Sequence, residues 1–212
     1  MSEERIHHPL FARLYMRAGS NRSSPEEQAH RRRLLAGLTG TVIEVGAGNG
    51  LNFPFYPPTV QHVLAVEPER TLRAAAIAAA AEAPVRVTVL DGVAGGLPAE
   101  DESFDAAVVS LVLCSVRDQE RALAELHRVI RPGGELRFYE HVVAEQPASV
   151  RLQRLADLTV WPRCAGGCHL GRDTGAAITR AGFVIERCER FLFMPGIPIV
   201  KLPHILGSAR RP

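Results

Sequence analysis

Three glycines, Gly46, Gly48 and Gly50, alternate with other residues directly after the first β-type hydrophobic segment of the chain. Glycines in this position let the backbone turn sharply and let a ligand approach main-chain N–H groups at the start of the next helix. Glu67 ends the following hydrophobic segment, where a carboxylate can accept hydrogen bonds from both hydroxyls of a ribose. The glycine loop and Glu67 together predict a nucleotide-type pocket.

The loop departs from the dinucleotide-binding pattern at one position. That pattern places its third glycine one residue later, and Leu51 occupies this place. A pyrophosphate could not pack as closely against the following helix. An NAD-dependent oxidoreductase is therefore the weaker interpretation, and a tight turn that binds nothing is the structural alternative.

Short β-type segments alternate with longer helical ones, which is typical of βαβ units and a mostly parallel sheet. The hydrophobic pattern predicts strands over 41–45, 62–66, 85–90, 104–111, 135–140, 183–191 and 201–209. Helices are predicted over 5–18, 25–38, 69–82, 118–130, 147–160 and 173–181. Residues 104–111 are rich in Ala and Val, which suits a central strand. Residues 132–134, Pro-Gly-Gly, predict a turn, and the last two strands should pair antiparallel.

Composition excludes several classes of protein. The chain has 212 residues, 46% hydrophobic and 23% charged, as in an ordinary globular domain. The net charge of +2 and the pI of about 8.5 fall short of a dedicated nucleic-acid binder. No apolar run approaches a membrane span, and the acidic N-terminus does not resemble a secretory signal. We expect a soluble cytoplasmic protein without membrane anchor or nucleic-acid partner, with its cysteines reduced.

Four segments, in this order, resemble class I S-adenosylmethionine-dependent methyltransferases. They are residues 42–50, Glu67, Leu97-Pro98 with Ser103-Phe104-Asp105, and residues 126–134. The resemblance covers residues ~38 to ~141. It implies S-adenosylmethionine as cofactor and a Rossmann-like α/β fold, a seven-stranded mostly parallel sheet with one antiparallel strand and helices on both faces.

Further segments are similar to the methyltransferase-like thiol S-methyltransferases, from the glycine loop to the C-terminus. They are residues 52–58, 111–120, 140–142, 167–172 and 203–209. The best-known animal members carry an N-terminal hydrophobic membrane anchor, which we do not expect in this chain.

The family resemblance also implies which residues bind the cofactor. The glycine loop would contact the methionine moiety, Glu67 the ribose, and the main chain of Ala94 the adenine. Val93 replaces the acid that usually reads the adenine edge, and Asp91 is a possible substitute. The expected cofactor-binding residues are Tyr15, Glu44, Gly46, Ala47, Gly48, Asn49, Glu67, Pro68, Gly92, Val93, Ala94, Ser110 and Leu111.

The chain is expected to form a single methyltransferase domain, residues 1–212. Residues 1–38 would be a helical lid, 39–141 the cofactor-binding core, and 142–212 the substrate side. A lid suits this chemistry because it excludes water.

The acceptor atom is argued from reactivity. Methyl transfer from a sulfonium is an in-line displacement that needs alignment more than a base. A thiol reacts as its thiolate, whereas an oxygen or carbon acid needs a positioned base, for which His141 is the candidate catalytic residue. A histidine that satisfies strand-end carbonyls is the structural alternative.

Residues 110–113, Ser-Leu-Val-Leu, lack the Asn/Asp-Pro-Pro-aromatic element that binds planar amines, so an apolar floor favours a small, soft acceptor. A thiol is the first choice. The alternatives are a phenolic or quinone-like oxygen or carbon and, more remotely, a cofactor-binding protein without turnover. The oligomeric state stays open.

The cysteines offer a separate possibility. Cys164, Cys168 with His169, and Cys188 could bind a soft metal or arsenite. Their spacing is not a standard zinc pattern, so no metal-binding residue is assigned. Cys114 is expected to be a small hydrophobic residue of the core.

Overall fold

A computed structural model gives the structure of the chain, and it describes residues 24–159, 161–193 and 201–212. The predicted first helix, 5–18, and the predicted cofactor-binding residue Tyr15 lie outside the described residues. No helix among the described residues is both long and apolar enough to cross a membrane.

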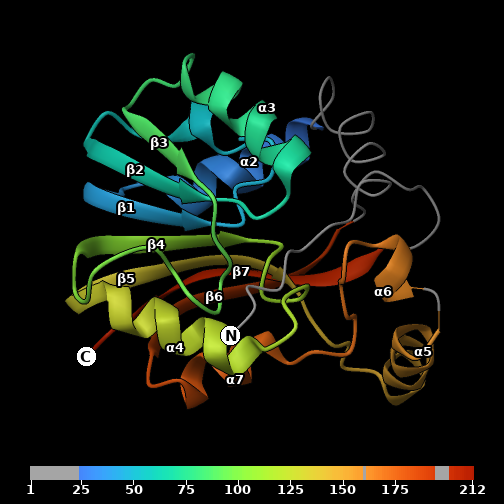
Figure 1. Cartoon of the computed structure of the whole chain (residues 1–212). Coiled ribbons are helices and arrows are strands. Elements are labelled where there is room, and N and C mark those ends of the chain that lie inside the picture. The colour runs from blue at the N-terminus through green and yellow to red at the C-terminus, as the bar shows by residue number, and fades with distance from the viewer. Residues whose placement is uncertain (1–23, 160, 194–200) are drawn as a thin grey trace.

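The described residues form one seven-stranded sheet (Figure 1) with the strand order β3-β2-β1-β4-β5-β7-β6. β7 is antiparallel to both β5 and β6, and the pairs among β1 to β5 are parallel. This confirms the expected fold, one antiparallel strand in a mostly parallel sheet. The strands are β1 Gly40–Val45, β2 Val60–Val66, β3 Val87–Leu90, β4 Phe104–Ser110, β5 Ile130–His141, β6 Val184–Phe193 and β7 Leu202–Arg210.

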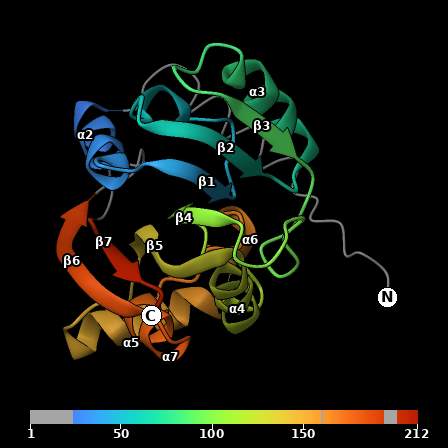
Figure 2. The same cartoon turned by 90° about the vertical axis from the view of Figure 1, so that its left-hand side faces the viewer.

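Helices cover both faces of the sheet (Figure 2). α2 (Pro25–Leu35) and α3 (Arg70–Ala80) pack on one face, and α4 (Gln119–Val129) and α7 (Thr174–Arg180) on the other. α5 (Pro147–Asp157) and α6 (Trp161–Cys164) lie beyond one end of the strands in Figure 1. A short 3-10 helix, η1 (Phe53–Phe55), follows the glycine loop.

Side-chain caps explain where three of these helices begin. Ser24 Oγ accepts a hydrogen bond from the Glu27 N–H, and Pro25 occupies the first turn of α2. Asp118 and Asp173 cap α4 and α7 in the same way. Such caps satisfy N–H groups that have no partner inside the helix.

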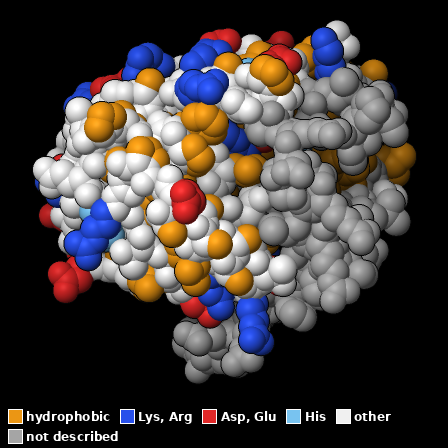
Figure 3. All heavy atoms as spheres, turned by 90° about the horizontal axis from the view of Figure 1, so that it is seen from above, with side chains coloured by type: hydrophobic (Ala, Val, Ile, Leu, Met, Phe, Trp, Pro, Cys, Tyr) orange, Lys and Arg blue, Asp and Glu red, His pale blue; other side chains and the backbone are white. Residues whose placement is uncertain are grey.

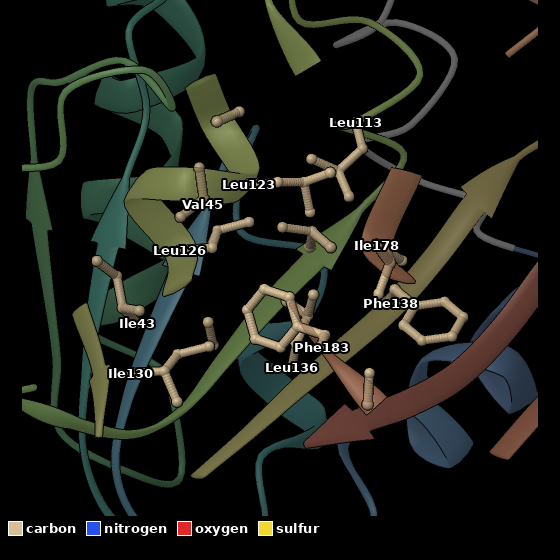
Figure 4. Packing of buried hydrophobic residues seen from close by; sticks show 14 of the residues in the cluster. Ile43, Val45, Leu113, Leu123, Leu126, Ile130, Leu136, Phe138, Ile178 and Phe183 are labelled. Carbon is tan, nitrogen blue, oxygen red and sulfur yellow. The ribbon is translucent and has the colours of Figure 1, made fainter. Parts of the chain in front are cut away.

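The larger core lies between the sheet and the α4–α7 layer (Figure 4). Leu123 and Leu126 of α4, Leu136 and Phe138 of β5 and Ile178 of α7 all belong to this core. A second core fills the α2–α3 side, so β1 and β4 are buried on both faces. This confirms β4 as a central strand.

One local prediction was wrong. The predicted turn at 132–134 is part of β5, where Gly133 has φ 79° and the pairing with β4 shifts register. Glycine allows this irregularity because it adopts positive φ without steric cost.

The face seen from above in Figure 3 carries hydrophobic side chains mixed with basic and acidic ones on its described part. That mixture agrees with the small net charge of the chain.

Candidate functional site

The strand order reverses between β1 and β4. The chain continues from β1 to β2 and β3 on one side, and from β4 to β5 on the other. In open α/β sheets ligands bind outside the carboxyl ends of the strands at such a switch point. The glycine loop follows β1 and therefore lies at this point.

The glycine loop is fastened to the end of β2. The N–H groups of Gly46 and Ala47 both donate to the Val66 carbonyl, at 2.8 and 3.2 Å. Gly46 has φ 69°, and a Cβ there would lie 2.5 Å from Val112 Cγ2. Only glycine accepts this backbone conformation and this close approach together.

Glu67 connects the loop to β2 and α3. Its Oε2 accepts a hydrogen bond from the Gly48 N–H at 2.7 Å, and its Oε1 accepts one from the Glu69 N–H at 2.9 Å. The residue is 5% exposed, and burial raises its pKa to about 7. The structure thus brings together the two features from which the sequence predicted a nucleotide pocket.

Several polar atoms near the carboxyl edge of the sheet are buried without a hydrogen-bond partner among the described residues. Two of them are Asn49 Oδ1 in the glycine loop and Ser110 Oγ at the end of β4. Leu111, the next residue, has φ 60°. Orphaned polar atoms and left-handed non-glycine backbone cluster where a protein binds a ligand.

The other expected cofactor residues lie at the ends of β2 and β3. The Pro68 carbonyl accepts a hydrogen bond from Arg73, which also pairs with Asp91 at 2.9 Å. Gly92, Val93 and Ala94 follow β3, and Val93 forms a bridge with Gly96. The side chain of Asp91 is 71% exposed.

His141 ends β5, and its imidazole is engaged with a thiol. Its Nδ1 lies 3.2 Å from Cys168 Sγ, and its Nε2 is buried without a partner among the described residues. A hydrogen bond between the Cys114 and Cys168 thiols lowers the pKa of Cys168 and raises that of Cys114. Cys114 is buried, as predicted, but it lies beside a second thiol and a histidine.

The sequence grouped Cys168 with Cys164, His169 and Cys188, whereas the structure places Cys168 beside Cys114 and His141. Cys188 is exposed on β6, apart from this cluster. The His169 Nδ1 contacts the carbonyl of Gly167 at 2.7 Å. The side chain of Cys164 lies outside the described part of the chain.

Glu140 has a role that the sequence reasoning missed. Its carboxylate is fully buried and accepts hydrogen bonds from the N–H groups of Val112, Leu113 and Cys114, at 2.9 to 3.1 Å. Glu140 therefore anchors the turn that follows β4. The position of an acidic residue near the end of a buried strand was the sequence feature that could have predicted this role.

Comparison with known proteins decides the family. A family model described as a methyltransferase domain matches residues 43–138. Thiol S-methyltransferase TMT1A of Homo sapiens is 37% identical over 180 residues, which cover 82% of this chain and 72% of that protein. The chain belongs to the thiol S-methyltransferase family.

Solved structures agree on the fold of this methyltransferase. A methyltransferase described as putative from Bacillus halodurans superposes with a TM-score of 0.72 at 17% identity, over 88% of this chain and 99% of that one. Geranyl diphosphate C-methyltransferase of Streptomyces coelicolor, solved with S-adenosyl-L-homocysteine, gives a TM-score of 0.69 at 14% identity, over 88% and 79%.

S-adenosylmethionine is the cofactor of this methyltransferase, and the switch-point residues fit it. The glycine loop follows β1 at the switch point, and Glu67 offers a carboxylate that accepts a hydrogen bond from the Gly48 N–H of this loop. Asn49 Oδ1 and Ser110 Oγ supply polar atoms that lack partners. A nucleoside with an amino-acid tail can use all of these groups.

Glu44 of β1 hydrogen-bonds to the segment that follows the glycine loop. Its carboxylate accepts hydrogen bonds from Asn52 Nδ2 at 2.9 Å and from the Tyr56 hydroxyl at 2.6 Å. Arg31 of α2 donates to Asn52 Oδ1 at 2.8 Å. Burial raises the pKa of Glu44 to about 7. The network holds the segment after the glycine loop against β1 and α2.

The raised pKa of Glu44 predicts a pH-dependent stability. The folded protein holds this proton more tightly than the unfolded chain, so the free energy of unfolding falls as pH rises from about 4.5 to about 7. A shift of this size corresponds to about 3 kcal/mol. Glu44→Gln should make that part of the profile less steep, measured by urea unfolding from pH 4.5 to 8. Parallel profiles for the two proteins would contradict the assignment.

A hollow of about 530 Å³ lies elsewhere, between the end of α2 and strands β6 and β7. Three arginines line it, Arg33, Arg137 and Arg187. It therefore does not match the apolar acceptor pocket expected from the sequence.

Proposed function

We propose that this methyltransferase transfers the methyl group of S-adenosylmethionine to the sulfur of a small-molecule thiol. The observation that supports this most directly is the 37% identity to a thiol S-methyltransferase over most of both chains. The chemistry agrees, because a thiolate needs alignment with the methyl group more than it needs a base.

The cofactor-binding residues are part of this proposal. The methionine part would lie against Gly46 to Asn49, the ribose would bind Glu67, and the adenine would lie between Pro68 and residues 92–94. The sulfonium would face Ser110 and Leu111. Bound there, the cofactor supplies a methyl group on a positively charged sulfur. Glu44 would hold the segment after the glycine loop in place through its hydrogen bonds to Asn52 and Tyr56. Tyr15 would belong to the proposed lid, residues 1–38.

We propose His141 as the catalytic residue. It ends β5, next to the end of β4, on the side where the acceptor would approach. The 3.2 Å contact to Cys168 supports a role for His141 together with that thiol rather than as an isolated base. Residues 142–212, which contribute Cys168, would form the substrate side of a single domain. The cytoplasm, a reducing compartment, would keep such thiols reduced.

A panel of acceptors tests the proposed function. The purified protein is incubated with S-adenosylmethionine labelled in the methyl group and, separately, with aliphatic and aromatic thiols, phenols and quinones. Labelled thioethers are the expected product. Label in phenols or quinones alone would favour the alternative O- or C-methyltransferase. Cofactor binding without any labelled product would indicate a binding protein without turnover.

A further inference from the structure

Two thiols and an imidazole meet beside the end of β5. Cys114, His141 and Cys168 each offer one ligand atom, and these three atoms lie within 4.8 Å of one another. Their exposed fractions are 1%, 7% and 5%. The residues come from the turn after β4, the end of β5 and the loop after α6. We call them the Cys–His cluster.

We propose that the Cys–His cluster binds a zinc ion. Zn–S distances of about 2.3 Å and Zn–N distances of about 2.0–2.1 Å put tetrahedral ligand atoms about 3.5–3.8 Å apart. The observed 3.2 Å between His141 Nδ1 and Cys168 Sγ, and the 4.8 Å limit for all three atoms, bracket that spacing. Small side-chain shifts would admit the ion.

The backbone already holds the ligand-bearing segments together. The His169 N–H donates to the Cys114 carbonyl at 2.8 Å, and Arg172 Nη1 donates to the Leu113 carbonyl at 2.8 Å. A Cβ on Gly167 would lie 2.7 Å from the Ser115 carbonyl oxygen, so the two segments touch. Ligands held this way lose little freedom when they bind an ion.

Charge balance favours a divalent ion over free thiolates. Two thiolates and Zn²⁺ sum to zero, with the imidazole neutral. Two buried thiolates without an ion would instead carry a charge that costs several kcal/mol or more. On binding, the thiol protons pass to solvent, and no electrons are transferred.

A disulfide accounts for less of this geometry. A Cys114–Cys168 bond would engage the two sulfurs and leave His141 Nδ1 buried without the Cys168 contact it now makes. A zinc ion engages all three ligand atoms. Two thiolates with one imidazole form a ligand set that zinc enzymes use when the fourth position stays open.

His204 can fix the imidazole in the form that binds metal. Its Nδ1 contacts the Leu202 carbonyl at 2.8 Å, so Nδ1 carries the hydrogen and Nε2 a lone pair. When His141 binds through Nδ1, its hydrogen is on Nε2. Both Nε2 atoms are buried without partners among the described residues, and the two ring centroids are 4.2 Å apart. The Nε2–H of His141 can therefore donate a hydrogen bond to the Nε2 of His204. A hydrogen bond from the other ring nitrogen is what usually orients a zinc-bound histidine.

The fourth position would bind the acceptor, and this step rests on the proposed function. A small thiol that loses its proton to solvent can complete the tetrahedron as a thiolate. The zinc ion would then hold the reacting sulfur beside the cofactor edge, and His141 would act as a ligand instead of a proton acceptor.

Metal content tests the inference directly. The full chain is purified under reducing conditions, equilibrated with Zn²⁺ and analysed by mass spectrometry and by competition with a chromogenic chelator. One tightly bound zinc per chain is expected. Replacement by Co²⁺ should give thiolate-to-cobalt charge-transfer absorption, which changes when an acceptor thiol is added. A wild-type protein that binds no zinc, or a cobalt spectrum without thiolate bands, would overturn the proposal.

Variants identify the ligands. Cys114→Ser, Cys168→Ser and His141→Gln should each weaken zinc binding at least about 100-fold, and Cys188→Ser, at an exposed cysteine, should not. Circular dichroism shows whether each variant is folded. If a variant does not fold, the cobalt spectrum of the wild type still tests the site. Zinc affinity equal to that of the wild type in both Cys114→Ser and Cys168→Ser would overturn the site.

Separate measurements can contradict the zinc site and the proposed function independently of each other. Zinc is measured without cofactor or thiol, and methylation is measured with metal-loaded and chelator-treated protein. Zinc bound by the cluster without any thiol methylation would remove the proposed function alone. Thiol methylation by a protein that binds no zinc would remove only the zinc site.

Discussion

Replacing Glu67 with alanine is expected to weaken S-adenosylmethionine binding about 10- to 100-fold. The carboxylate would accept hydrogen bonds from the ribose hydroxyls, and hydrogen bonds to a charged group contribute about 1.5–3 kcal/mol. It also accepts the Gly48 N–H at 2.7 Å, so the variant loosens the glycine loop as well. Titration calorimetry with the cofactor measures the change.

The matched control is Asp91→Asn. Asp91 lies near the same edge, but its side chain is 71% exposed and paired with Arg73, so its replacement should change affinity less than about threefold. A large loss in Asp91→Asn would instead identify it as the adenine partner. Unchanged affinity in Glu67→Ala would mean that the cofactor binds elsewhere.

The pKa of Glu67 adds a second readout. Burial raises it to about 7, and the protonated carboxyl accepts hydrogen bonds less well than the carboxylate. Cofactor affinity should therefore fall as pH drops below about 7. Glu67→Gln should remove this inflection. An unaltered pH profile in that variant would assign the inflection to another group.

Gly207→Ala is expected to destabilise the fold by at least about 3 kcal/mol. Gly207 lies in β7 between β5 and β6, where an added Cβ would lie 2.0 Å from the Arg187 carbonyl oxygen and 2.7 Å from Phe138 Cζ. The first neighbour is backbone, so strands must move apart. The thermal midpoint should drop by about 6–12 °C, measured by calorimetry.

Gly96→Ala is the control for this variant. Its added Cβ would have no heavy atom within 4 Å, so the free energy of unfolding should change by no more than about 0.5 kcal/mol. Equal losses in the two variants would show that the close approach at β7 does not limit stability.

The sequence alone predicted the parallel core of the fold. Alternating hydrophobic periods located β1, β2, β4 and the helix α3 because a strand buried on both faces and an amphipathic helix leave different local patterns. It did not predict that β5 includes residues 132–134. Whether a Pro-Gly-Gly segment turns or bulges depends on the neighbouring strand, and here Ile130 pairs with Phe104 before the register shifts.

The glycine loop and Glu67 were readable for the same reason: each stands at a strand end, and parallel strands bring their carboxyl ends to one edge. The tertiary structure alone decided how the thiols group. Cys114, His141 and Cys168 are 27 residues apart at each step along the chain, and no local pattern relates them. Only the pairing of β4 with β5 and the path of the loop after α6 put their donor atoms within 4.8 Å. The same holds for Glu140, because the N–H groups that it binds belong to a turn at the end of another strand.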